Sequence, residues 1–152
     1  MNKHTPKQRL AAYDGDFHLW SQTQAALIRE GRIGEIDLAN VAEEIESLGR
    51  CDRREIRRRL EILLIHLLKW EFQKAKRKNG WKTSIAEARR GIKKLIDESP
   101  SLQGFPALAL SEEYASARQA AADETGLGED SVPLECPYTI ADIFTRGFLP
   151  GA

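Results

Sequence analysis

The chain has 152 residues, of which 41% are hydrophobic and 30% are charged, with 23 basic and 23 acidic side chains. This composition is typical of a globular protein and excludes a disordered or membrane-spanning chain. The longest stretch with little charge, residues 62–68, is far shorter than the roughly 20 apolar residues of a transmembrane helix. The N-terminal residues lack the apolar core of a secretory signal, so we expect a cytoplasmic protein.

The first half of the chain carries two short helix patterns. Asp14 has the residue type of an N-cap, and Gly31 suits the left-handed position after the last turn, so a first helix is predicted between them. A second, acidic helix is predicted from Asp37, as its N-cap, to Gly49. Its apolar stripe consists of Leu38, Val41, Ile45 and Leu48.

A long third helix is predicted next. Asp52 and Glu55 have the spacing of a capping box, and the helical pattern continues to about Lys78. The core stripe consists of Ile56, Leu60, Leu63, Leu67 and Trp70. The second half of this helix is hydrophobic nearly all round, because apolar groups also stand at Leu64, Ile65, Leu68 and Phe72. Such a helix is either central in its bundle or part of an oligomer interface.

The remaining residues predict three more helices. Asn79-Gly80 indicates a turn before the fourth helix, and Pro100 stops that helix. The alanine-rich fifth helix ends at Gly126, and Thr139 with Asp142 starts a short sixth one. We therefore predict an all-α single domain over residues 1–152, a bundle of about five or six helices with one long central helix. Residues 1–12 are expected to form a loosely ordered N-terminal segment.

Polar residues follow one edge of the long helix. At about 100° per residue, Glu55, Arg59, Ile62, His66, Lys69 and Gln73 fall on one line. If the second and third helices pack as an antiparallel hairpin about Gly49, carboxylates of the second helix would face this edge. The resulting candidate polar cluster consists of Asp37, Glu44, Arg59, His66, Lys69 and Gln73.

Two interpretations of this cluster remain open. The favoured one is a buried hydrogen-bond network that fixes the register of the hairpin, because buried polar groups must be paired. In the other, Glu44, His66 and Lys69 converge on a cleft and act as acid and base or bind a metal. The bundle motif Glu-x-x-His is absent, since Leu63 stands where the glutamate would be, so we predict no metal and no cofactor.

Basic residues dominate the middle of the sequence. Residues 50–96 hold sixteen Lys and Arg against five Asp and Glu. The candidate anion-binding residues are Arg50, Arg53, Arg54, Arg57 and Arg58. No nucleic-acid-binding motif accompanies them, and the neighbouring second helix is acidic, so a mutually compensating charged face is favoured over a nucleic-acid site. The two cysteines, Cys51 and Cys136, are too few and too far apart for a zinc site and are expected to be inert thiols.

The order of the motifs resembles one known family. The motifs are YDGDFHLW (13–20), DLANVAEEIESLGR (37–50), HLLKWEFQ (66–73), WKTSIAEAR (81–89), SPSL (99–102), ETGL (124–127) and CPY (136–138). Together they resemble the bacterial family catalogued as domain of unknown function number twenty-nine. The resemblance implies an all-helical fold and no activity. Cys51 departs from the family pattern, in which a serine is expected at that position.

The sequence leads to three functional hypotheses. The leading one is a small helical binding or regulatory protein that acts through protein–protein contacts, self-association as a homodimer included, because residues 62–72 are apolar nearly all round. The second is nucleic-acid binding through the arginine-rich start of the long helix. The third is an enzyme or metal site built on Glu44, His66 and Lys69, and we favour a protein that is not an enzyme. No membrane partner is expected.

Overall fold

A computed structural model describes residues 13–151 of the chain, and the expectation for residues 1–12 lies outside this range. The helices are α2 (Phe17–Arg29), α3 (Leu38–Phe72), α4 (Asn79–Glu98), α5 (Phe105–Thr125) and α6 (Ile140–Phe144). Single 3-10 turns lie between them, and residues 13–151 contain no strand. The all-α fold with one long helix is confirmed.

The chain divides into two compact units, whose boundary falls inside α3. Met1–Arg50 form the N-terminal unit, and Cys51–Ala152 form the C-terminal unit. The charge changes at this boundary, from a predominantly acidic sequence before it to a predominantly basic one after it, yet the sequence alone predicted one domain without an internal division. Each unit has its own set of contacts and is described separately.

Helix α3 runs without a break where the sequence predicted two helices. The predicted turn at Gly49 and the predicted helix start at Asp52 are both wrong, because both residues lie inside α3. A glycine in a helix interior costs about 1 kcal/mol relative to alanine. A break would instead leave about four backbone N–H and four C=O groups without partners at the two new ends. One glycine among good helix formers is therefore not enough to end the helix.

The N-terminal unit is built from α2 and the first turns of α3. Asp16, and not the predicted Asp14, caps α2, since its carboxylate accepts a hydrogen bond from Leu19 N at 2.9 Å. Gly31 has φ +70°, which confirms the left-handed position predicted after the helix. Trp20 is buried and donates its indole N–H to Asp37 at 3.1 Å. This bond ties α2 to the residue that immediately precedes α3.

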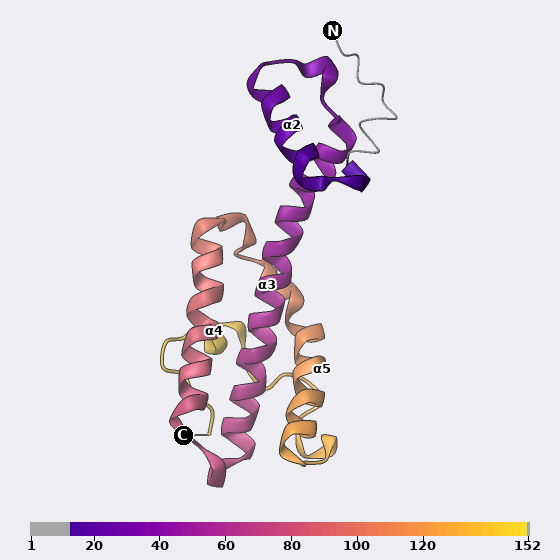
Figure 1. Cartoon of the computed structure of the whole chain (residues 1–152). Coiled ribbons are helices and arrows are strands. Elements are labelled where there is room, and N and C mark those ends of the chain that lie inside the picture. The colour runs from indigo at the N-terminus through magenta and orange to yellow at the C-terminus, as the bar shows by residue number, and fades with distance from the viewer. Residues whose placement is uncertain (1–12, 152) are drawn as a thin grey trace. The chain divides into compact units, whose positions relative to one another are not determined.

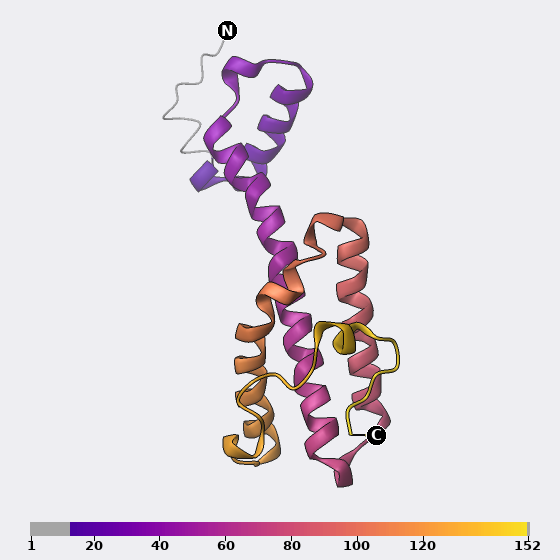
Figure 2. The same ribbon diagram turned by 180° about the vertical axis from the view of Figure 1, so that it is seen from behind.

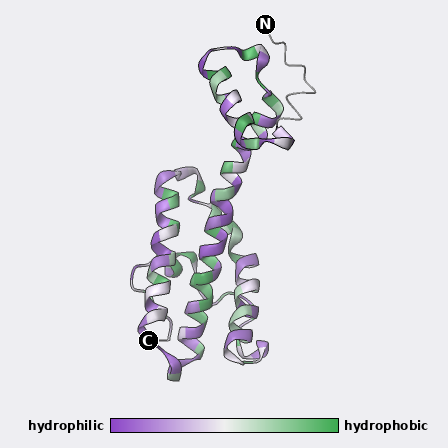
Figure 3. Ribbon diagram, in the orientation of Figure 1, coloured by the Kyte–Doolittle hydropathy of each residue, from purple (hydrophilic) through white to green (hydrophobic). Residues whose placement is uncertain are grey.

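The C-terminal unit places the second half of α3 between α4 and α5 (Figures 1 and 2). Hydrophobic residues follow this part of α3 (Figure 3). All five residues of the predicted core stripe are buried, and so are Leu64, Ile65 and Leu68 on the other sides of the helix. Their near all-round apolar surface is therefore covered by the unit's own core, which also contains Ile85 and Ile92 of α4 and Tyr114 of α5.

Two of the other predicted helix ends agree with the structure, and two do not. Gly126 has φ +70° after α5, and Thr139 with Asp142 forms the predicted capping box of α6. Asn79 and Gly80, however, form the first turn of α4 and not a turn before it. Helix α3 ends at Phe72, and not near Lys78 as predicted; the 3-10 turn Lys74–Lys76 and the extended backbone of Lys78, with φ −146° and ψ 158°, connect it to α4.

The unbroken helix predicts the effect of changing Gly49 to alanine. Gly49 does not have a positive φ, and a Cβ at this position would meet nothing within 4 Å. Gly49→Ala should therefore raise the free energy of unfolding by about 0.5–1 kcal/mol. Denaturant unfolding followed by circular dichroism measures this change. Gly126→Ala is the control and should destabilise the protein, because Gly126 has φ +70°. A loss of stability in Gly49→Ala would contradict the continuous helix.

Candidate functional site

The two candidate residues of the N-terminal unit have local partners. The Asp37 carboxylate accepts hydrogen bonds from Trp20 at 3.1 Å and from the Asn40 side chain at 2.8 Å. The Glu44 carboxylate accepts a hydrogen bond from the Tyr13 hydroxyl at 2.6 Å. This bond to Glu44 raises the pKa of Tyr13 to about 12. Asp37 and Glu44 thus hold α3 against the residues that precede it.

Arg59 and His66 are occupied by contacts close to α3. Arg59 donates from Nε to Glu55 at 2.7 Å, and its guanidinium lies against Gly91 of α4, where an added Cβ would collide with it. His66 Nδ1 lies 2.7 Å from Ile62 O on its own helix. Since a carbonyl oxygen only accepts, Nδ1 carries the proton in this contact.

Lys69 and Gln73 complete the polar edge. Lys69 Nζ lies 3.0 Å from a Glu124 carboxylate oxygen on α5 and 5.0 Å from the centre of the Trp81 ring. Gln73 directly follows α3 and precedes a 3-10 turn, without a side-chain capping bond. The edge therefore connects α3 to α4 and α5 within the C-terminal unit.

The predicted hairpin that would unite this cluster is wrong. Glu44 and His66 lie on the same continuous helix, separated by about six turns, so no reversal at Gly49 brings them face to face. The network interpretation holds only locally, as separate pairs on α3 and its neighbours. Within residues 13–151, no group of three or more His, Cys, Asp or Glu side chains is arranged to hold a metal ion.

Most of the arginine-rich residues are paired with carboxylates. Arg57 donates to Glu112 at 2.8 Å and to Glu113 at 3.2 Å, and both acceptors lie on α5. Arg58 pairs with Glu55, and Arg50 pairs with Glu43, both within α3. Burial raises the pKa of Glu113, and the Arg57 guanidinium opposes this effect. Only Arg50 uses an acid of the predicted second helix, whereas the partners of Arg57 come from a distant part of the sequence.

The last two arginines of this set are less constrained. The Arg53 guanidinium lies 6.0 Å from the centre of the Phe105 ring. Arg54 is exposed and forms no ion pair with any described residue. The set as a whole is a largely compensated charged surface.

An exposed apolar face in the N-terminal unit is the feature that the sequence did not predict. Leu38, Ile45 and Leu48 are 62%, 64% and 70% exposed, although their spacing indicated a core stripe. The side of α3 that carries Asn40 and Glu44 is half-buried instead. The hydrogen bonds of Asp37 and Glu44 determine which side of α3 packs inside the unit. We refer to Leu38, Ile45 and Leu48 as the N-terminal apolar face.

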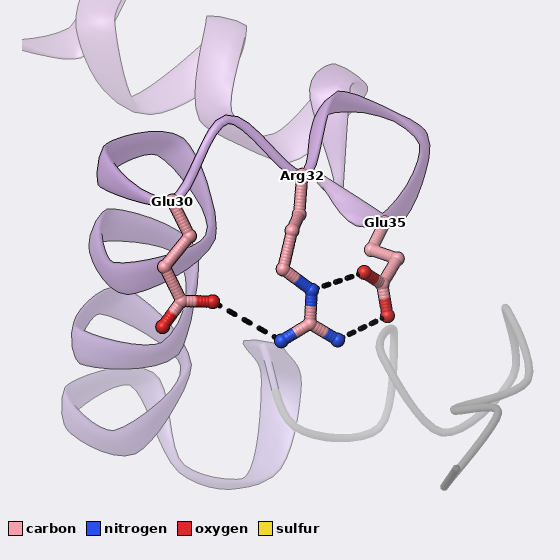
Figure 4. A network of polar contacts seen from close by, with 3 residues as sticks. All are labelled: Glu30, Arg32 and Glu35. Atoms are coloured by element: carbon pink, nitrogen blue, oxygen red, sulfur yellow. Dashed lines mark hydrogen bonds and ion pairs between the residues drawn. The ribbon is translucent and has the colours of Figure 1, made fainter.

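The N-terminal unit that carries this face is strongly acidic as a whole. Residues 13–50 contain eight Asp and Glu against three Lys and Arg. Arg32 is held between Glu30 and Glu35, as Figure 4 shows, with Nη2 2.7 Å from Glu35 and Nη1 3.1 Å from Glu30. Arg50 pairs with Glu43, so two of the three bases are already neutralised. The N-terminal unit therefore combines an exposed apolar face with a net negative charge.

The fold and these contacts define a small all-α protein in which the predicted polar cluster is divided into separate local pairs. The chain belongs to the family described as Domain of unknown function DUF29, whose model matches residues 12–149. The resemblance drawn from the motifs is thus confirmed, and it assigns no activity. No curated protein and no solved structure matches the chain. Among the described residues, no helix is both long enough and apolar enough to cross a membrane.

The pairing of Glu55 predicts a pH-dependent contribution to stability. Hydrogen bonds from Arg58, and then from Arg59, lower the pKa of Glu55 from 4.5 to about 2. A carboxylate with a lowered pKa stabilises the fold above its unfolded pKa, and this contribution is lost as the pH falls from 4.5 toward about 2. The side chain is 35% exposed, so solvent screening keeps the effect well below that of a buried pair.

Glu55→Gln should therefore lower the free energy of unfolding at neutral pH and have little effect near the lowered pKa. Denaturant unfolding of the unmodified protein and the variant, at several pH values, measures the difference. Glu87→Gln is the control, because Glu87 is exposed and has no ion-pair partner among the described residues. A difference that is constant across the acidic range would contradict the proposed pairing.

Proposed function

We propose that this protein acts by binding another protein, and that the N-terminal apolar face receives a basic amphipathic helix of that partner. The observation that carries the proposal is the uneven exposure of hydrophobic side chains. Of the nine large hydrophobic residues that are exposed in the described chain, seven belong to the N-terminal unit. They are Phe17, Leu19, Ile28, Ile33, Leu38, Ile45 and Leu48.

The spacing of the face suits a helical partner. Leu38, Ile45 and Leu48 stand at i, i+7 and i+10 on α3 and so project from one side of the helix. An amphipathic helix inserts apolar side chains at the same spacing. Burying a leucine or isoleucine side chain contributes about 1.5–3 kcal/mol, so three such residues are enough for a specific contact.

The charge of the unit supports a basic partner. Clustered acids attract Lys and Arg at the rim of an interface, which speeds association and excludes like-charged competitors. A homodimer formed through this face would bring two acidic units together, and their like charges would repel each other. Nucleic acid is disfavoured as well, because its phosphates would be repelled by the acidic unit. The arginines that would bind phosphate are largely paired with Glu43, Glu55, Glu112 and Glu113.

We also propose a cytoplasmic location. Cys51 and Cys136 are free thiols, and Cys51 is exposed. Exposed thiols persist in a reducing compartment, whereas oxidising compartments favour disulfides.

A peptide titration of the full chain tests the proposed surface. The probe is a labelled amphipathic helical peptide of leucine and lysine, and fluorescence anisotropy measures its affinity. The double variant Ile45→Gln, Leu48→Gln should bind the peptide about tenfold or more weakly, because it removes two apolar anchors. Leu108→Gln is the matched control, since Leu108 is an exposed leucine of the C-terminal unit, and it should leave the affinity unchanged.

Two comparisons separate this occupant from others. A peptide with the same leucines and with glutamate in place of lysine should not bind, and added salt should weaken the lysine peptide. Equal affinity of the double variant and the unmodified protein would overturn the proposed surface. If light scattering shows a dimer that the double variant dissociates, the occupant is a second copy and the basic helix is excluded.

A further inference from the structure

A pocket of about 370 Å³ lies in the C-terminal unit, away from the residues considered so far. Its wall is formed by α4, by residues around the start of α5, and by α6. The lining residues that matter here are Arg89, Lys93, Ile96, Asp97, Ile140 and Phe144. The volume is at the lower end of the range of small-molecule sites, and apolar walls with a few polar groups are typical of such sites.

Arg89 is the unusual group in this pocket, because it is a buried cation without a carboxylate partner. The side chain is 8% exposed, and burial lowers the pKa of its guanidinium. Nε donates to Ile143 O at 2.7 Å and Nη2 donates to Phe148 O at 3.3 Å. Both acceptors are neutral carbonyl groups, so the positive charge is solvated by dipoles and not neutralised.

The guanidinium retains donors for a ligand. It has five N–H groups, and the two contacts to carbonyl oxygens leave Nη1 without a partner among the described residues. Trp70 Nε1 is the one side-chain nitrogen or oxygen in residues 13–151 that is both buried and unpartnered. Nη1 of Arg89 is therefore not sealed inside the protein, and Arg89 lines the pocket.

The other charged groups give the pocket a positive end. Lys93 follows Arg89 by one turn on α4, is exposed, and forms no ion pair with a described residue. Asp97 is one turn further along, about 12 Å from Arg89 by the rise of the helix. An anion bound beside Arg89 is thus attracted by two cations, and Asp97 lies on the far side of Lys93 from Arg89 along α4.

We propose that this pocket binds a small organic anion, with a carboxylate or phosphate head on Arg89 and Lys93 and a short apolar body against Ile96, Ile140 and Phe144. A guanidinium and an ammonium both form strong charge-assisted hydrogen bonds to either head group. The apolar walls exclude water from the body of the ligand and strengthen these contacts. The site is separate from the N-terminal apolar face and does not depend on it.

A purely structural role of Arg89 is the competing explanation. Its bonds to Ile143 and Phe148 hold the C-terminal residues on α4, and this role would need no ligand. Lys93 distinguishes the two explanations, because it has no partner to hold and its removal should not affect packing. The test therefore uses Lys93 as the variant position and leaves Arg89 in place.

The experiment is a titration of the isotope-labelled full chain followed by amide chemical shifts. The probes are hexanoate and hexyl phosphate, which share a body and differ in the head, with inorganic phosphate and hexanol as the head alone and the body alone. At least one of the two anions should cause saturable shifts confined to α4, α6 and the start of α5. Lys93→Gln should weaken this binding about tenfold, whereas Lys94→Gln, next along the same helix and outside the pocket, should not.

Several results would overturn the proposal. They are the absence of saturable shifts with both anions, equal binding of hexanol, equal binding of inorganic phosphate, and equal weakening in Lys93→Gln and Lys94→Gln. Ala141→Phe adds an independent check, because Ala141 is an exposed lining residue and a phenyl group would occupy the space of the ligand. It should abolish binding while leaving both cations in place, and unchanged binding in this variant would place the anion elsewhere.

Discussion

The hydrogen-bond ladder of α3 passes Gly49 without a break, and the arrangement of all candidate residues depends on this continuity. A helix that ended at Gly49 would have folded its acidic part back against the core stripe. Because α3 continues from Leu38 to Phe72, the acidic part instead contacts Trp20 of α2 through Asp37 and contacts Tyr13 through Glu44. The candidate polar cluster is thereby divided into separate pairs, and the apolar face at Leu38, Ile45 and Leu48 is left uncovered.

Features that depend on neighbouring residues were predictable from the sequence. The core stripe of α3 follows from helical periodicity, and Gly31, Gly126 and the capping box at Thr139 act within one or two turns. Gly49 and Asn79-Gly80 carry signals of the same strength, yet both are helical. Residues of these types lower the free-energy cost of ending a helix at their position, and tertiary contacts determine whether the helix ends there.

The two surfaces proposed for binding were not predictable because they depend on contacts between distant residues. The orientation of α3 in the N-terminal unit is determined by two bonds, Tyr13 to Glu44 and Trp20 to Asp37, which span 31 and 17 residues. The buried guanidinium of Arg89 donates its hydrogen bonds to carbonyl groups 54 and 59 residues later in the chain. Periodicity identifies an apolar stripe or a cation on α3 or α4, but it does not show whether another element covers it.

Stability alone does not explain either of the proposed surfaces. Leu38, Ile45 and Leu48 keep most of their area in water, so their apolar character contributes little to the folding of their own unit. Arg89 illustrates the opposite case, since burial of an unneutralised guanidinium is costly and two carbonyl groups offset only part of that cost. A partner helix would remove the N-terminal apolar face from water, and an anion would neutralise the guanidinium of Arg89. In both places, the proposed binding would supply the interaction that the fold itself leaves incomplete.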